Sequence, residues 1–139
     1  MNRNYTIYTL LGVGLALVLA FGFQERLEVH PYVTWLGGFT FVTWAIWAWD
    51  KRVAEVSGYM KRAKGARVPE FTLNLLVLLG GFLGGWAARA MFQHKSNVKR
   101  HPTILAMLII STLFHALFIV RLIYGPPLVL WPPDNWFRF

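Results

Sequence analysis

Residues 71–92 read FTLNLLVLLGGFLGGWAARAMF, and this stretch decides how the chain folds. Its first eighteen residues carry no charge, and its centre is the run Gly80-Gly81-Phe82-Leu83-Gly84-Gly85. Twenty-two residues in one helix span about 33 Å, which is enough to cross the hydrocarbon layer of a membrane. Four glycines in six residues equally allow the backbone to turn, provided that neighbouring helices shield its polar groups. The stretch therefore predicts a membrane segment that either crosses or is re-entrant.

Three further apolar runs flank this segment along the chain. They cover residues 5–23, 32–49 and 103–120 without a charged residue, and each approaches the roughly twenty residues that a membrane-crossing helix needs. Hydrophobic residues make up 56% of the 139 residues and charged residues only 14%, which excludes an ordinary water-soluble monomer. We expect an all-α, polytopic membrane bundle of three to four hydrophobic segments. The predicted single domain, 1–139, has helices at about 5–23, 32–49, 71–92 and 103–124 and an extended, Pro- and Trp-rich tail at 125–139.

The distribution of Lys and Arg predicts the orientation of these segments. Residues 24–31 contain one such residue and residues 50–70 contain six, so the positive-inside bias places the second connection and the N-terminus in the cytoplasm. If residues 71–92 cross the membrane, nine basic residues lie inside and five outside. If the segment is re-entrant, the counts become eleven and three. The bias favours the re-entrant hairpin.

Small residues indicate where helices pack closely. Gly12, Ala16 and Ala20 are spaced by four and form one smooth face of the first predicted helix. The central glycines also form two pairs at this spacing, which is the alternative explanation for them in a straight helix. Those pairs are Gly80 with Gly84 and Gly81 with Gly85. Such faces predict contacts with other helices of this chain or of partner subunits.

An ordered set of short motifs suggests a family. The chain carries Asp50-Lys51-Arg52, Arg67-Val68-Pro69-Glu70, the leucine-rich run 73–79 that ends in Gly80-Gly81, and His94-Lys95. Over about residues 44–95 this order resembles the family called domain of unknown function 1294. It departs from the family pattern in three places. Leu83 stands where the family often has proline, Ser96 replaces the usual threonine, and the gap at residues 53–66 is longer than is usual in the family. The resemblance implies a small bacterial protein of the cytoplasmic membrane and supplies no reaction.

The charged residues of these motifs have two interpretations. In a re-entrant arrangement all of them lie near the cytoplasmic surface, where two carboxylates, cations and an imidazole would form a site able to bind an anion or move a proton. In the other interpretation they are helix-end devices: Pro69 at the first helical position, Glu70 at the positive end, Asp50 ending the second helix. The motif residues are Asp50, Lys51, Arg67, Glu70, His94 and Lys95.

The basic run at residues 61–67 is more consistent with lipid contact than with nucleic acid. It lies on a connection between membrane segments, where each cation near anionic headgroups contributes about 1 kcal/mol. Only Tyr59 is nearby to stack on a base. We therefore expect anionic lipids and other membrane protein subunits as partners, and no nucleic acid.

His115 stands near the centre of the last apolar segment and needs a polar partner there. One hypothesis is that it ligates a chlorophyll-type pigment through an imidazole nitrogen. The other is a hydrogen bond within the helix to Ser111, four residues earlier. The sequence requires no cofactor, and its histidines and carboxylates show no metal-site spacing.

No motif of the sequence indicates a reaction. The chain has no cysteine, and its three serines are in no nucleophile-elbow context. The function predicted from sequence is that of a small accessory or structural subunit of a larger bacterial membrane complex, without catalysis of its own. The alternatives are a minimal membrane enzyme or transporter that uses Asp50, Arg67, Glu70 and His94, and a pigment-associated subunit that uses His115.

Overall fold

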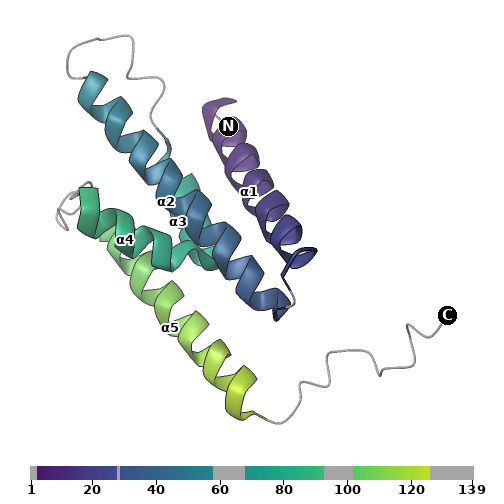
Figure 1. Cartoon of the computed structure of the whole chain (residues 1–139). Coiled ribbons are helices and arrows are strands. Elements are labelled where there is room, and N and C mark those ends of the chain that lie inside the picture. Colours follow the sequence, from purple (N-terminus) through teal and green to yellow (C-terminus); the bar gives the residue numbers. More distant parts are fainter. Residues whose placement is uncertain (1–2, 28, 58–67, 93–101, 126–139) are drawn as a thin grey trace.

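The computed structural model describes residues 3–27, 29–57, 68–92 and 102–125, and its secondary structure there is entirely helical (Figure 1). Length and composition make three stretches able to cross a membrane: Thr6–Gln24, Glu70–Phe92 and Pro102–Tyr124. The predicted all-helical, multi-pass membrane fold is thus confirmed. Along the chain the elements are α1 (Arg3–Gln24), α2 (Pro31–Ser57), α3 (Glu70–Leu76), the wider turn η2 (Val77–Gly81), α4 (Phe82–Phe92) and α5 (Pro102–Tyr124).

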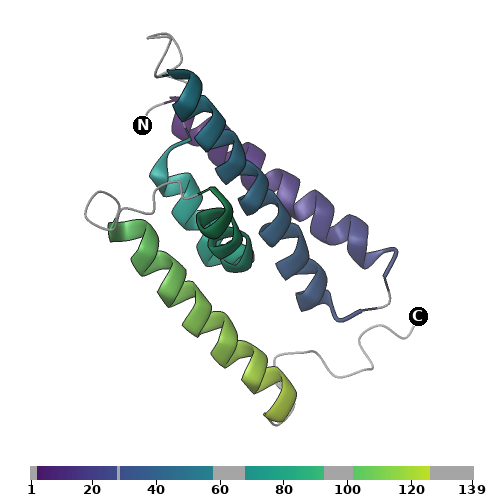
Figure 2. The same cartoon turned by 60° about the vertical axis from the view of Figure 1, so that its left-hand side comes forward.

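Helix α2 is the longest element, and it lies between α1 and the α4 and α5 helices (Figures 1 and 2). Helix α1 also contacts α3 directly, through a hydrogen bond of 2.9 Å between the Thr9 and Thr72 hydroxyls. The apolar run of α2 contains several threonines and tryptophans. The polar residues Thr34, Thr43 and Asp50 of this helix are buried. The prediction that α2 ends at Trp49 is wrong, because the helix continues to Ser57. The prediction assumed that the Asp50 carboxylate must reach water at the membrane surface. It need not do so, because the backbone amide of Val68 donates a hydrogen bond to it inside the protein.

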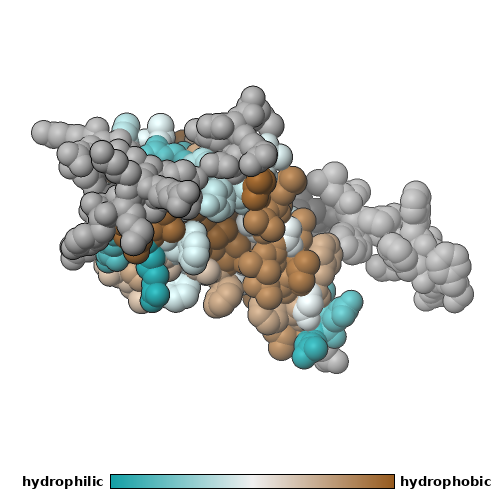
Figure 3. All heavy atoms as spheres, turned by 90° about the horizontal axis from the view of Figure 1, so that it is seen from above, coloured by the Kyte–Doolittle hydropathy of each residue, from teal (hydrophilic) through white to brown (hydrophobic). Residues whose placement is uncertain are grey.

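The outer surface of the bundle is apolar. Figure 3 looks down on the molecule and shows hydrophobic residues over much of the visible described surface. Large hydrophobic side chains that are 60% exposed or more cover the outer faces of α1 and α5, as expected of helices that contact lipid tails. These side chains include Leu10, Leu11, Val18 and Phe21 on α1, and Leu113, Phe114, Leu117 and Ile123 on α5.

Small residues allow α1 and α2 to approach each other closely. Ala16 and Ala20 are buried, and a Cβ at Gly38 would lie 2.7 Å from the Ala16 carbonyl oxygen. A Cβ at Gly12 would lie 3.0 Å from Ile46 of α2. The small-residue face predicted on the first helix therefore lies against a helix of the same chain.

The chain reverses direction at Gly80. This residue has φ 129° and ψ −2°, a backbone conformation that residues other than glycine rarely adopt. Figures 1 and 2 both show that α4 leaves the turn at a steep angle to α3 and runs back toward the side on which α3 began. Although residues 70–92 have the length and composition of a span, they do not form one straight helix.

The remaining three central glycines let the returning helix approach its neighbours. A Cβ at Gly81 would collide with Thr43, and one at Gly84 would collide with the Thr40 carbonyl oxygen, so α4 crosses α2 at backbone distance. A Cβ at Gly85 would lie 2.7 Å from Leu108 of α5. The two explanations of the glycines from sequence thus apply together: Gly80 turns the chain, and the others are packing positions.

Candidate ligand pocket at the glycine turn

Three consecutive carbonyl groups precede the glycine turn, and each accepts a hydrogen bond from another helix. Ser111 Oγ of α5 donates to the Val77 carbonyl at 2.7 Å. The Leu78 carbonyl lies 3.1 Å from His115 Nε2, also of α5, and Trp35 Nε1 of α2 donates to the Leu79 carbonyl at 2.7 Å. Carbonyls at the end of a helix lack partners in their own helix, and a membrane interior supplies no water to replace them. Side chains therefore satisfy the backbone at this break.

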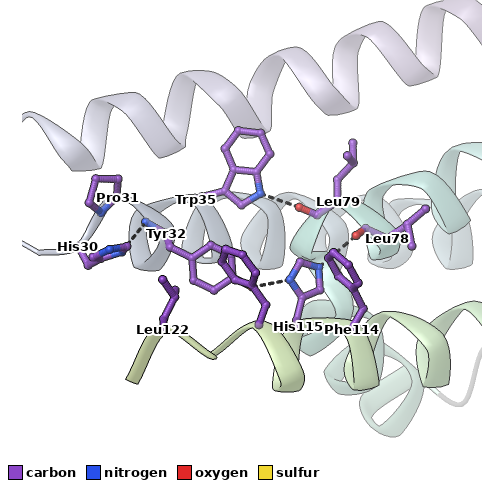
Figure 4. Close-up of a pocket in the computed structure, with 10 residues that line it drawn as sticks. His30, Pro31, Tyr32, Trp35, Leu78, Leu79, Phe114, His115 and Leu122 are labelled. Atoms are coloured by element: carbon purple, nitrogen blue, oxygen red, sulfur yellow. Dashed lines mark hydrogen bonds between the residues drawn. The ribbon is translucent and has the colours of Figure 1, made fainter. Parts of the chain in front are cut away.

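His115 connects the turn to Tyr32 at the start of α2 (Figure 4). Its Nδ1 lies 2.5 Å from the Tyr32 hydroxyl, and its ring stacks on Phe82 with 5.2 Å between centroids. A carbonyl oxygen can only accept, so Nε2 must carry the ring proton that it shares with Leu78. In the neutral ring Nδ1 is then an acceptor, and the Tyr32 hydroxyl donates to it.

A cavity of about 820 Å³ opens between α2 and α5, next to the tip of the turn. Because the chain folds back at Gly80, none of the described helices fills this part of the space between α2 and α5, which both extend beyond the turn (Figures 1 and 2). The volume lies within the range of small-molecule pockets in proteins. Its apolar walls include Trp35, Leu78, Leu79, Phe114, Phe118 and Leu122, and Tyr32 and His115 are also part of its lining.

A second group of polar atoms lies where α2 meets the hairpin formed by α3, η2 and α4. Among the described residues, the Oγ1 atoms of Thr40 and Thr43, Trp47 Nε1 and Asn74 Oδ1 are buried without a hydrogen-bond partner. The three α2 residues follow the spacing of one helix face, and Thr43 contacts Gly81. We assign these atoms no ligand.

The predicted charged motif is only partly within the described residues. Asp50 is fully buried, and its Oδ1 accepts a hydrogen bond of 2.9 Å from the backbone amide of Val68, just before α3. This hydrogen bond links α2 to the start of the hairpin. The interpretation that Asp50 ends the second helix is wrong, because α2 continues to Ser57. Arg67, His94 and Lys95 lie outside the described residues, so the proposed cluster stays a prediction.

The other described motif residues are Lys51, inside α2, and Glu70, at the start of α3. Lys51 pairs with Glu55 one helical turn later at 3.6 Å, and its ammonium lies 5.7 Å from the centre of the Phe92 ring. Glu70 is the first residue of α3, where a negative charge is favourable. Pro69 precedes the helix as its N-cap and is not its first residue, one position away from the prediction.

Sequence reasoning found His115 but not its partners. The expected hydrogen bond from His115 to Ser111 is wrong, because both side chains reach across to the glycine turn instead. Tyr32 and Trp35 were not predicted as site residues. Their signal was only that two polar-tipped aromatic residues begin an apolar run, which is also typical of a membrane interface.

The hydrogen bonds of His115 also affect its ability to bind a pigment metal. Both nitrogens of His115 take part in hydrogen bonds, so coordination of a pigment metal would require one of these bonds to break. Within the described ranges, no group of three or more His, Cys, Asp or Glu side chains is placed to hold a metal ion.

Three apolar helical stretches and a satisfied backbone break define a multi-pass helical membrane protein. Residues 40–101 match the model of a family described as protein of unknown function (DUF1294), which confirms the resemblance inferred from the motifs. No match was found among curated proteins or among solved structures. The matched region contains the hairpin, whereas Tyr32, Trp35 and His115 lie outside it.

Proposed function

We propose that the α3–η2–α4 unit is a re-entrant hairpin of the bacterial cytoplasmic membrane, with both ends on the cytoplasmic face. The positive φ of Gly80 and the three side-chain hydrogen bonds to the preceding carbonyls support a turn inside the membrane. The positive-inside bias supports the same arrangement, with eleven basic residues inside and three outside. Helices α1, α2 and α5 then cross the membrane, and the N-terminus is cytoplasmic.

Because the natural chain has no cysteine, single-cysteine labelling tests this topology without background. The variants are Glu25→Cys after α1, Glu55→Cys near the end of α2, and Met91→Cys near the end of α4. A membrane-impermeant maleimide is applied to inverted and to right-side-out vesicles. We expect Met91→Cys to label from the same side as Glu55→Cys. Labelling from the side of Glu25→Cys would show that the segment crosses.

We further propose that the protein binds a lipid-soluble small molecule in the cavity between α2 and α5. The observation that carries this proposal is a cavity of about 820 Å³ with mostly apolar walls and a hydrogen-bonded polar pair, Tyr32 and His115, in its lining. This composition fits a ligand with an apolar body and a single polar group. We propose binding without a reaction, because a ligand could reach either His115 nitrogen only by displacing Tyr32 or the Leu78 carbonyl from it.

Two variants of α5 test the binding proposal. Leu122→Trp places a larger side chain in the cavity wall, whereas Leu117→Trp makes the same change at a position that is 71% exposed and outside the cavity. The proteins are purified in a mild detergent, and bound small molecules are measured by native mass spectrometry. We expect the wild type and Leu117→Trp to retain the same ligand and Leu122→Trp to lose it. Equal retention by both variants would refute the proposal.

A second candidate function is the accessory subunit expected from the sequence. It is supported by the outer face of α1, where Leu11 and Val18 are 65% and 67% exposed one above the other. A protein partner that docks there should co-purify with the wild type and be lost from the Leu11→Trp, Val18→Trp double variant. Unchanged co-purification would leave lipid contact as the role of this face.

A further inference from the structure

We infer that the cavity selects a ligand that donates a hydrogen bond, namely a long apolar molecule carrying a hydroxyl group, which Tyr32 accepts. This inference rests on the proposed binding function and names its ligand class. It follows from the direction of the hydrogen bonds of Tyr32 and His115, which leaves an acceptor at the Tyr32 oxygen and no free donor on either of these two side chains.

The direction is fixed at the backbone. The Leu78 carbonyl can only accept, so the proton between it and His115 lies on Nε2. A neutral imidazole has one N–H, and Nδ1 must therefore accept. The only proton that Tyr32 carries on its oxygen is then directed at Nδ1, across 2.5 Å.

Within the Tyr32–His115 pair, the atom that can still form a hydrogen bond is the Tyr32 oxygen. After donating its proton, a phenolic oxygen keeps a lone pair that can accept one more hydrogen bond. Another donor of the lining, Trp35 Nε1, is already engaged at 2.7 Å with the Leu79 carbonyl. His30 is exposed and its Nδ1 accepts from the Tyr32 amide, so its remaining N–H is on Nε2; Figure 4 shows this ring on the opposite side of Tyr32 from His115.

A ligand carbonyl or ether oxygen would face this lone pair without a proton between them. To donate to such a ligand, Tyr32 would have to release His115 Nδ1, which would then be a buried acceptor without a partner. Sites built around one hydrogen bond discriminate strongly against analogues that lack the matching group. The hydroxyl can come from two kinds of lipid-soluble molecule, an isoprenoid alcohol or a quinol.

Binding of a matched ligand series tests this inference. The probes are geranylgeraniol, its methyl ether and its aldehyde, together with a short-chain ubiquinol and the corresponding quinone, each titrated into the detergent-solubilised protein by calorimetry. We expect the alcohol or the quinol to bind about tenfold more tightly than its partner that lacks the hydroxyl proton. The tighter of these two classes identifies the source of the hydroxyl.

The Tyr32→Phe variant provides the matched control, since it removes the oxygen and keeps the ring. We expect alcohol and ether to bind it with affinities within twofold of each other. Ether, aldehyde or quinone binding as tightly as the hydroxyl compounds to the wild type overturns the inference and leaves the binding function intact. Binding of no probe by the wild type, together with no retained ligand, overturns both. The wild-type series alone decides the matter if Tyr32→Phe does not fold.

Discussion

The substitution Gly80→Ala distinguishes a glycine turn from a straight helix by the sign of its effect. At φ 129° an alanine is strained, which costs about 1–3 kcal/mol. Its Cβ would also lie 3.2 Å from Leu36 Cδ2 and 3.3 Å from Trp35 Nε1, so the neighbours must shift. In a straight helix the same change would instead stabilise by about 0.5–1 kcal/mol, because alanine has the higher helix propensity.

The magnitude is measured by unfolding the protein in mixed micelles with increasing SDS and following its helical circular dichroism. We expect Gly80→Ala to lower the free energy of unfolding by about 2 kcal/mol, the middle of the range for such strain. The control is Gly14→Ala, because a Cβ at Gly14 of α1 has no atom within 4 Å, and it should be neutral or slightly stabilising. A stabilising effect of Gly80→Ala equal to that of the control would refute the turn.

Three further substitutions test other parts of the arrangement by the same unfolding measurement. Ser111→Ala leaves a buried carbonyl of the turn without its donor and should cost about 1–2 kcal/mol; no change would mean that this hydrogen bond is absent. Asp50→Leu removes the acceptor of the amide that precedes α3 and should cost about 2 kcal/mol or more, whereas Asp50→Asn keeps an acceptor oxygen and should cost less. Gly38→Ala pushes α2 away from the α1 backbone and should cost about 1–3 kcal/mol, while Gly37→Ala, with open space around its Cβ, should be tolerated; equal effects would contradict the close helix contact.

Composition and the long uncharged runs were sufficient to predict the membrane fold, because placing charge or unpaired backbone groups in lipid is energetically costly. The sequence also located the place where the helix breaks, since Gly80 is the first of four closely spaced glycines. Which glycine turns and which ones pack could not be predicted, because both roles favour the same residue. Only the backbone conformation separates Gly80 from Gly84.

The pocket was less accessible to sequence reasoning. His115 was recognisable as a polar residue in an apolar run, but its partners are 83 residues away at Tyr32 and 37 residues away at Leu78. One of these partners is a backbone carbonyl, which has no residue signature at all. Asp50 was misinterpreted for the same reason, because its partner is the amide of Val68.

The hydrogen bonds at the turn have a consequence for how the chain is made. Two of the three carbonyls before Gly80 accept hydrogen bonds from Ser111 and His115, which are synthesised 34 and 37 residues later than the carbonyls they satisfy. In the re-entrant arrangement proposed above, the tip of the hairpin therefore has unsatisfied backbone acceptors until α5 has been synthesised, and its burial in lipid is costly until then. In that arrangement, we expect the hairpin to reach its final depth in the membrane only after α5 has packed against it.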